Sequence, residues 1–192
     1  SPIEKSPLSW YDHKQEGRRC QLRNSYIDGW NLAKTSKEYL NKEIDFKKLL
    51  DYFSREAYVL RAFYYIGEVQ DPEERKRQQS FLTWLKRNGY KVITRPIKTF
   101  VDQNGERKEK ADLDVDIAID MFDLADKVDK VVLFSGDGDF TRLIERIGMK
   151  GVKTMVVSHW GRGKGPIDPK LMEAADEFLD LEEIIDEIAK IK

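Results

Sequence analysis

Short apolar runs alternate along this chain with segments whose apolar residues recur at helical spacing. Runs dense in β-branched and aromatic residues predict strands over 25–27, 59–66, 90–94, 131–134 and 152–157. Helical spacing predicts helices over 46–53, 72–85, 112–127, 140–147, 171–175 and 181–191. The residues after 25–27 are expected to form a loop. Alternating strands and helices predict an α/β fold, a three-layer α/β/α sandwich around a central, mainly parallel sheet.

Cap and turn residues mark several boundaries between these elements. Asp71-Pro72-Glu73-Glu74 combines a capping residue, a proline at the first helical position and acids on the helix dipole. Asn88-Gly89 is a signal for the end of that helix. Asn104-Gly105 lies between two charged β-prone segments, so a charged hairpin is expected there.

Domain organisation follows from the same pattern. Residues 1–21 show no clear period and are expected to form an extended N-terminal arm, which Trp10 and Tyr11 could anchor on the body. Residues 22–192 are expected to form one domain, because no linker-like stretch divides them. No internal repeat or low-complexity tract is present.

Composition narrows the class of protein. The formal net charge of the 192 residues is −1, so any basic footprint for nucleic acid has to be local. The single Cys20 excludes an intrachain disulfide and suits a reducing compartment. No apolar run approaches the ~20 residues of a membrane span, and the N-terminal residues lack the apolar core of a signal peptide. We therefore expect a cytoplasmic protein without a membrane partner.

Acidic residues follow two of the predicted strands directly. Asp137 and Asp139 lie in Ser135-Gly136-Asp137-Gly138-Asp139-Phe140, after the apolar run 131–134, and Asp28 follows 25–27. The carboxyl ends of strands are where open α/β sheets form their sites. Carboxylate oxygens that converge in space suit a hard divalent cation.

A fourth acid stands out on the helix predicted over 112–127. At about 100° per residue, one stripe of this helix collects Asp112, Asp116, Asp120 and Asp123, which is most simply a solvated face. Asp114 lies nearly opposite, among apolar residues, where an isolated carboxylate costs several kcal/mol. It is either a residue that satisfies the helix N-terminus or a metal ligand facing the strand-end acids. Asp112 is assigned mainly to the N-cap, and Asp116 is either a solvated residue or an outer-shell ligand.

Other common sites find no support in the sequence. The two acids of Asp137-Gly138-Asp139 could merely shape a turn, but the later ligands of a calcium-binding EF-hand loop are missing. The chain has neither G-x-G-x-x-G after its first strand nor a P-loop. Neither histidine has the spacing of a zinc ligand, and Cys20 is read as a bystander.

Local basic residues are the candidates for contact with phosphate. The hairpin region carries Arg95, Lys98, Arg107, Lys108 and Lys110, and a flexible glycine-rich loop over 159–166 carries Arg162 and Lys164. Trp160 beside these two cations could stack a base. The alternatives are a solvated charged face for the hairpin and a turn whose tryptophan covers the core.

Four sequence motifs, in the expected order, resemble the NYN domain, LabA-like branch, of the PIN/FLAP nuclease-like superfamily. They are Y-I-D-G-W-N-L, K-A-D-L-D-V-D-I-A-I-D, V-V-L-F-S-G-D-G-D-F-T-R-L-I and A-A-D-E-F-L-D-L. The resemblance runs from about residue 25 to residue 181 and leaves the arm outside it. It implies a PIN-like, Rossmannoid sandwich with an acidic pocket that binds Mg²⁺ or Mn²⁺.

By motif position, the resemblance assigns the metal-binding and catalytic roles to Asp28, Asp114, Asp137 and Asp139. Asn31, Ser135 and Lys110 match accompanying polar positions, and Asp116 is a further supporting candidate. The implied activity is that of a divalent-metal-dependent nuclease, most simply a ribonuclease. The alternative is a non-catalytic RNA- or protein-binding regulator that retains the pocket, and a third class is an enzyme acting on small phosphoesters.

The partner implied is nucleic acid, RNA favoured over DNA, with a protein partner or a second copy of the chain as a further class. Contacts with nucleic acid are expected from Arg107, Lys110, Trp160, Arg162 and Lys164.

Overall fold

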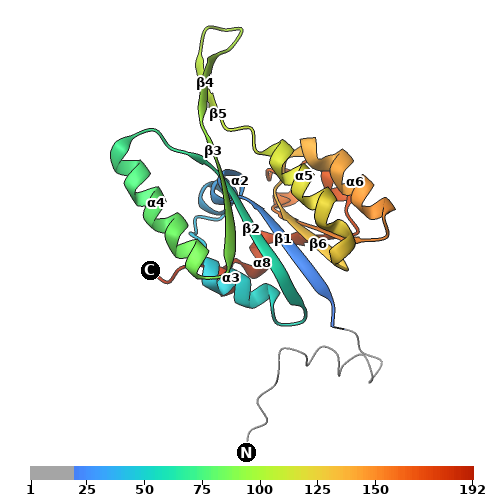
Figure 1. Ribbon diagram of the computed structural model, residues 1–192. Helices are drawn as coiled ribbons and strands as arrows, with labels where there is room; N and C mark the ends of the chain where they lie inside the picture. The colour runs from blue at the N-terminus through green and yellow to red at the C-terminus, as the bar shows by residue number, and fades with distance from the viewer. Residues whose placement is uncertain (1–19) are drawn as a thin grey trace, which may run out of the picture.

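The computed structural model describes residues 20–192, and the predicted arm with Trp10 and Tyr11 lies almost wholly outside the described residues. At its centre is a six-stranded sheet in which every neighbouring pair is parallel (Figure 1). In spatial order its strands are β3 (Tyr90–Pro96), β2 (Tyr58–Glu68), β1 (Leu22–Asp28), β6 (Lys130–Phe134), β7 (Lys153–Ser158) and β8 (Glu177–Asp180). The α/β class and the parallel sheet predicted from the sequence are confirmed.

Helices cover both faces of this sheet. One buried cluster packs α3 (Phe46–Phe53), α4 (Pro72–Arg87) and α8 (Leu181–Ile188) on the first face. A second cluster packs α5 (Asp114–Leu124), α6 (Thr141–Met149) and α7 (Pro169–Ala174) on the opposite face. Successive side chains of a strand point to opposite faces of the sheet. Tyr64 therefore belongs to the first cluster and Tyr65 to the second. The result is the three-layer sandwich (Figure 1).

The cap and turn signals act as predicted. The Asp71 side chain accepts a hydrogen bond from the Glu74 amide at 3.0 Å, and Pro72 opens α4. Beyond the end of α4, Gly89 has a φ of +96°, a backbone conformation that glycine adopts without strain.

The predicted hairpin is also present. Strand β4 (Lys98–Val101) pairs antiparallel with β5 (Arg107–Lys110), and Gly105 in the connecting turn has a φ of +79°. The hairpin projects away from the body of the molecule (Figure 1), and the side chains of β4 are exposed.

Two elements differ from the sequence-based expectation. The segment after β1 is no loop: α2 (Gly29–Lys34) begins directly at the strand end and continues into a π-helical turn, Thr35–Tyr39. Helix α2 is only six residues long and buries only Gly29 and Leu32, too few positions to show a period. Strand β8 was not predicted, because its four residues are at most half-buried and form no continuous apolar run.

Among residues 20–192, no helix has the length and apolar character needed to cross a bilayer.

Candidate metal centre at the carboxyl edge of the sheet

The strand order places two of the predicted acids beside each other. From β1 the chain builds outward through β2 to β3, and it then returns to the other side of β1 with β6, β7 and β8. The order therefore reverses between β1 and β6, and ligands of open α/β sheets bind outside the carboxyl ends of strands at such a point. Asp28 is the last residue of β1, and the loop with Asp137 and Asp139 follows β6.

Hydrogen bonds fix the loop after β6. The Asp137 amide donates to Ser135 Oγ at 3.2 Å, and the Asp139 amide donates to Asp137 Oδ1 at 2.9 Å. Asp137 thereby caps a short 3₁₀ turn, Gly138–Phe140, which leads into α6. The turn-forming role weighed for these acids is real, and it holds the carboxylates at a defined place.

Three carboxylates meet at this loop. Asp114, at the first turn of α5, joins Asp137 and Asp139, and one ligand oxygen of each lies within 4.8 Å of the others. Two oxygens bound to one octahedral Mg²⁺ are at most about 4.2 Å apart. Small side-chain rotations would therefore bring these three oxygens to coordination distance of one cation. The donors are all hard oxygens, and Asp114 and Asp137 are half-buried whereas Asp139 is exposed. The group suits Mg²⁺ or Mn²⁺ better than zinc.

Asp28 lies beside this group, and the negative charges of the group affect its pKa. Its Oδ2 accepts a hydrogen bond from Ser135 Oγ at 3.1 Å. Burial raises the pKa of Asp28 to about 6; the Ser135 hydrogen bond opposes the shift, and the negative charges of Asp114 and Asp137 add to it. We refer to Asp28, Asp114, Asp137 and Asp139 as the acid cluster.

Two of the predicted supporting residues connect the elements around the acid cluster. Ser135 is buried and bridges the Asp137 amide to the Asp28 carboxylate. Asn31 Oδ1, on α2, accepts from the Gly136 amide at 3.0 Å and so ties α2 to the loop after β6. Lys110 ends β5, four residues before Asp114 in the chain, and its predicted role stays a prediction.

The predicted solvated stripe on α5 is partly wrong. The helix begins at Asp114 with Leu113 as the N-cap, so Asp112 is an exposed residue before the helix and not its cap. Asp116 forms two hydrogen bonds with Arg95, at 2.9 and 2.7 Å, and Arg95 lowers the pKa of its carboxyl group. Asp120 accepts from the Tyr65 hydroxyl at 2.8 Å. Of the acids within the helix, Asp123 is exposed as predicted.

The stripe differs from the prediction because α5 has two apolar faces. Ile117 and Met121 are buried in the core, whereas Val115, Ile119 and Phe122 are exposed. The acids between these faces reach partners on β2 and β3 that the helical pattern alone does not reveal. Asp116 is therefore held by an ion pair with Arg95 and does not belong to the group of candidate ligands.

Asp168 is a residue near the site that sequence reasoning missed. Its side chain caps α7 by accepting from the Lys170 amide at 2.8 Å, and its amide donates to the Gly136 carbonyl at 3.0 Å. A methyl group at Gly138 would lie 2.7 Å from the Asp168 carboxyl carbon, so the glycine leaves room for this carboxylate. The Asp168-Pro169 pair was a readable helix-start signal, but nothing in the sequence placed it beside the loop after β6.

The glycine-rich loop is an ordered turn in the structure. The Gly163 and Gly165 amides both donate to the Trp160 carbonyl, at 3.0 and 2.9 Å, and the Trp160 amide donates to Asp180 at 3.1 Å. Trp160 is 47 % exposed, so it does not cover the core, and Arg162 and Lys164 are exposed with it. Arg107 is exposed on the hairpin. The predicted contacts of these residues with nucleic acid stay predictions.

A second group of possible ligand atoms lies at the end of β7, from His159, Asp180 and Glu182. Here the His159 ring is hydrogen-bonded through Nδ1 to Asp180 at 2.8 Å, and Asp180 also caps α8 by accepting from the Glu182 amide at 3.0 Å. These bonds join β7, β8 and α8, so the group has a structural explanation.

Comparisons with known proteins agree with this description. The NYN domain model matches residues 25–182. A protein of Synechococcus elongatus, "Low amplitude and bright protein LabA", is 37% identical over 163 residues, which cover 83% of each chain. A crystal structure of a protein of unknown function from Vibrio parahaemolyticus superposes with a TM-score of 0.73 at 28% identity, over 89% of this chain and 97% of that one.

The match to the family model includes all four residues of the acid cluster. The acidic group at the carboxyl edge fits the chemistry of a nuclease that uses a divalent metal. The fold, the matched residues and the identity to LabA lead to one conclusion: the chain belongs to the NYN domain family.

Proposed function

We propose that this protein is a divalent-metal-dependent nuclease that hydrolyses phosphodiester bonds, with RNA as its substrate. The observation that carries the proposal is the approach of the Asp114, Asp137 and Asp139 oxygens to within 4.8 Å of one another, with Asp28 beside them. Asp116 is left out of the proposed set because Arg95 engages it.

The residues of the chain have distinct tasks in this proposal. Asp114, Asp137 and Asp139 would hold Mg²⁺ or Mn²⁺, and Asp28 would complete the set from the side of β1. When bound, such an ion lowers the pKa of a water ligand and stabilises the attacking and leaving oxygens of an in-line displacement. Ser135 orients Asp28 and the amide of Asp137 at the same time, and Asn31 fixes the backbone at Gly136. Both are positioning residues.

Electrostatics explains why basic residues are needed around the acid cluster. Four carboxylates repel one another and repel the backbone of a nucleic acid, so a cation at the cluster and positive side chains around it have to offset this repulsion. We propose Arg107 and Lys110 on the hairpin and Arg162 and Lys164 in the glycine-rich loop for the second task, with Trp160 as a stacking surface for a base.

The test is cleavage of end-labelled single-stranded RNA and DNA by the full chain, with Mn²⁺, with Mg²⁺ and with EDTA. We expect RNA products with metal and none with EDTA, and a rate reduced by at least about a hundredfold in Asp137→Asn. Asp123→Asn is the matched control, because Asp123 is an exposed acid on α5. Cleavage that persists in EDTA or in Asp137→Asn would refute the proposal.

The second candidate is a regulator that binds RNA or protein and retains the acid cluster without catalysis. RNA binding without cleavage under any of these metal conditions would favour it. Size measurement of the same sample would test for a second copy of the chain as partner.

A cytoplasmic location is part of the proposal, motivated by the single Cys20, and cell fractionation tests it.

A further inference from the structure

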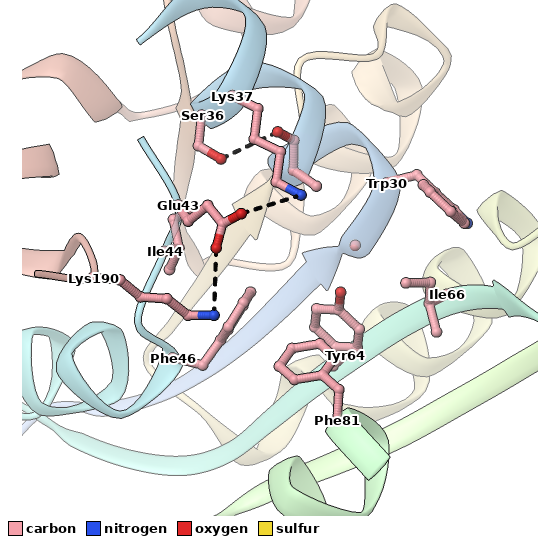
Figure 2. Close-up of a pocket in the computed structure, with 12 residues that line it drawn as sticks. Trp30, Ser36, Lys37, Glu43, Ile44, Phe46, Tyr64, Ile66, Phe81 and Lys190 are labelled. Carbon is pink, nitrogen blue, oxygen red and sulfur yellow. Dashed lines mark hydrogen bonds and ion pairs between the residues drawn. The ribbon is translucent and has the colours of Figure 1, made fainter. Parts of the chain in front are cut away.

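A cavity of about 260 Å³ is lined by residues of α2 and β2 (Figure 2). Its lining includes four aromatic residues and two isoleucines. We use the name aromatic pocket for the part of the cavity lined by Trp30, Phe46, Tyr64, Ile66 and Phe81. The volume is slightly below the range of about 300–1,000 Å³ that holds drug-sized ligands, so it suits a small planar group.

The aromatic rings of the pocket hold one another in place. Tyr64 meets Phe46 and Phe81 edge-on, with ring centroids 5.3 and 5.8 Å apart, and Phe46 lies 5.6 Å from Phe81. Gly29 forms part of the lining, and a methyl group there would meet the Tyr64 hydroxyl at 2.8 Å. The pocket is therefore a preformed feature that depends on a glycine next to Asp28.

The hydroxyl of Tyr64 is the polar group of the aromatic wall. Tyr64 is 3% exposed as a whole residue and lines the cavity. Its hydroxyl points towards the start of α2, where Gly29 lies (Figure 2). Burial raises the pKa of this hydroxyl, which keeps it protonated. A protonated hydroxyl in the wall can exchange hydrogen bonds with polar atoms of a ligand that enters the cavity.

Lysines surround the mouth of the pocket. Lys37 and Lys190 line it, and an adjoining hollow adds Lys42 and Lys192. Among residues 20–192, Glu43 is the acidic side chain that lines these two cavities, and it lies 3.9 Å from Lys37 and 3.5 Å from Lys190. These four lysines, the lysine rim, leave a local excess of positive charge on a chain whose net charge is −1.

The pocket and the acid cluster meet at the end of β1. Gly29 and Trp30 of the pocket follow Asp28 of the acid cluster in the chain, and the charge of Asp28 acts on the Tyr64 hydroxyl. Trp30 is 48% exposed, so part of its side chain is accessible to a ligand at the mouth.

We propose that the aromatic pocket receives one nucleobase of a single-stranded nucleic acid, whose phosphates contact the lysine rim. A base matches the site because it is flat and apolar on its faces and carries polar atoms on its edge for the Tyr64 hydroxyl. Cations beside an aromatic platform are the usual means of holding a single strand. The inference rests on the proposed function in one respect: the strand held here is the one presented to the acid cluster.

The first test measures binding of a fluorescein-labelled single-stranded RNA of about ten nucleotides, in EDTA so that no cleavage occurs. Trp30→Ala is expected to weaken binding about 5- to 150-fold, the range for loss of one stacked base. Tyr64→Phe keeps the ring and is expected to weaken binding about 2- to 10-fold. Trp84→Ala is the control, because Trp84 is 39% exposed on α4 and does not line the pocket.

The second test asks whether the pocket binds the base itself. A strand with one abasic nucleotide is moved through each position in turn. With the wild type, an abasic nucleotide at one position is expected to lower the affinity about as much as Trp30→Ala does. The strand that is abasic at this position should bind Trp30→Ala no more weakly than the intact strand does. Replacing Lys37 and Lys190 together by Gln should lower the slope of log affinity against log salt by about one to two units. Lys76→Gln with Lys86→Gln on α4 is the matched control.

Equal affinity of wild type, Trp30→Ala and Tyr64→Phe, or no abasic position with an effect, overturns the inference. Its failure is separable from that of the proposed function. Mn²⁺-dependent cleavage with an unchanged KM in Trp30→Ala would refute the pocket and leave the nuclease. Base-dependent binding without cleavage would refute the nuclease and leave the pocket.

Discussion

Asp28 and Asp139 carry the same carboxyl group in very different surroundings. Asp28 is half-buried, hydrogen-bonded to Ser135 and close to two further carboxylates, whereas Asp139 is exposed at the start of a helical turn. The motif placed both acids at strand ends, but a sequence does not show how much water each retains. The difference matters because a buried, repelled carboxylate makes the stability of the protein depend on pH and on cations.

The first prediction concerns this dependence. The pKa of Asp28 is raised from 3.8 to about 6, so the folded state binds the proton more tightly than the unfolded state. Asp28 therefore lowers the free energy of unfolding as pH rises from about 4 to about 6, by up to about 3 kcal/mol. In EDTA, Asp28→Asn should be more stable than wild type at pH 7, with little difference near pH 4. Urea unfolding of both proteins at both pH values measures this difference in stability. A wild type that becomes more stable relative to the variant as pH rises would contradict the prediction.

The second prediction separates two acids of α5. Asp114→Asn removes the charge of a proposed metal ligand and should weaken Mn²⁺ binding by at least about tenfold. Asp120→Asn should change it by less than about twofold, because Asp120 is outside the candidate ligand set and an amide oxygen can still accept from the Tyr65 hydroxyl. Titration calorimetry with Mn²⁺ decides between them. Equal losses in both variants would show that the two acids are not distinguished as proposed.

At the scale of elements, the strength of the local signal decided what the sequence could predict. Strand β6 is a continuous buried run, and α4 carries a cap, a proline and a closing glycine, so both were predicted. Helix α2 and β8 are short and depend on packing against neighbours, which leaves little local pattern. The place of Asp114 among apolar residues of its helix, together with the family resemblance, predicted that it belongs with the strand-end acids. Asp168 could not be placed, because only the tertiary structure brings α7 to Gly138.

The third prediction tests this contact between elements. Gly138→Ala would place a methyl group against the Asp168 carboxylate and should destabilise the protein by about 1–3 kcal/mol, while disturbing the loop that carries Asp137 and Asp139. Adding Asp168→Ala should recover part of the loss, because it removes the group that the methyl contacts. A double-mutant cycle from urea unfolding gives the coupling energy, expected to be about 1 kcal/mol or more. Strictly additive effects would show that the two residues do not share this space.

At the scale of the whole molecule, the distribution of charge matters more than its sum. The net charge is −1, yet acids gather at the carboxyl ends of β1 and β6 while lysines gather at the mouth of the aromatic pocket. The hairpin and the glycine-rich loop add further exposed cations, Arg107 on the first and Arg162 and Lys164 on the second. A strand bound across this surface would meet cations around a cluster that needs a metal ion before phosphate can approach it.

The last prediction tests whether the glycine-rich loop grips the strand. Binding of single-stranded RNA should weaken as salt rises, with a slope set by the number of phosphates neutralised. Replacing Arg162 and Lys164 together by Ala should reduce that slope by about one to two units. Trp160→Ala should weaken binding to single strands more than to a duplex, because only unstacked bases are free to stack on the exposed indole. Affinity measured against salt for wild type and these variants checks both effects. If wild type shows no salt-dependent binding to RNA or DNA with Mg²⁺ or Mn²⁺ present, the nuclease proposal fails and a role in protein interaction replaces it.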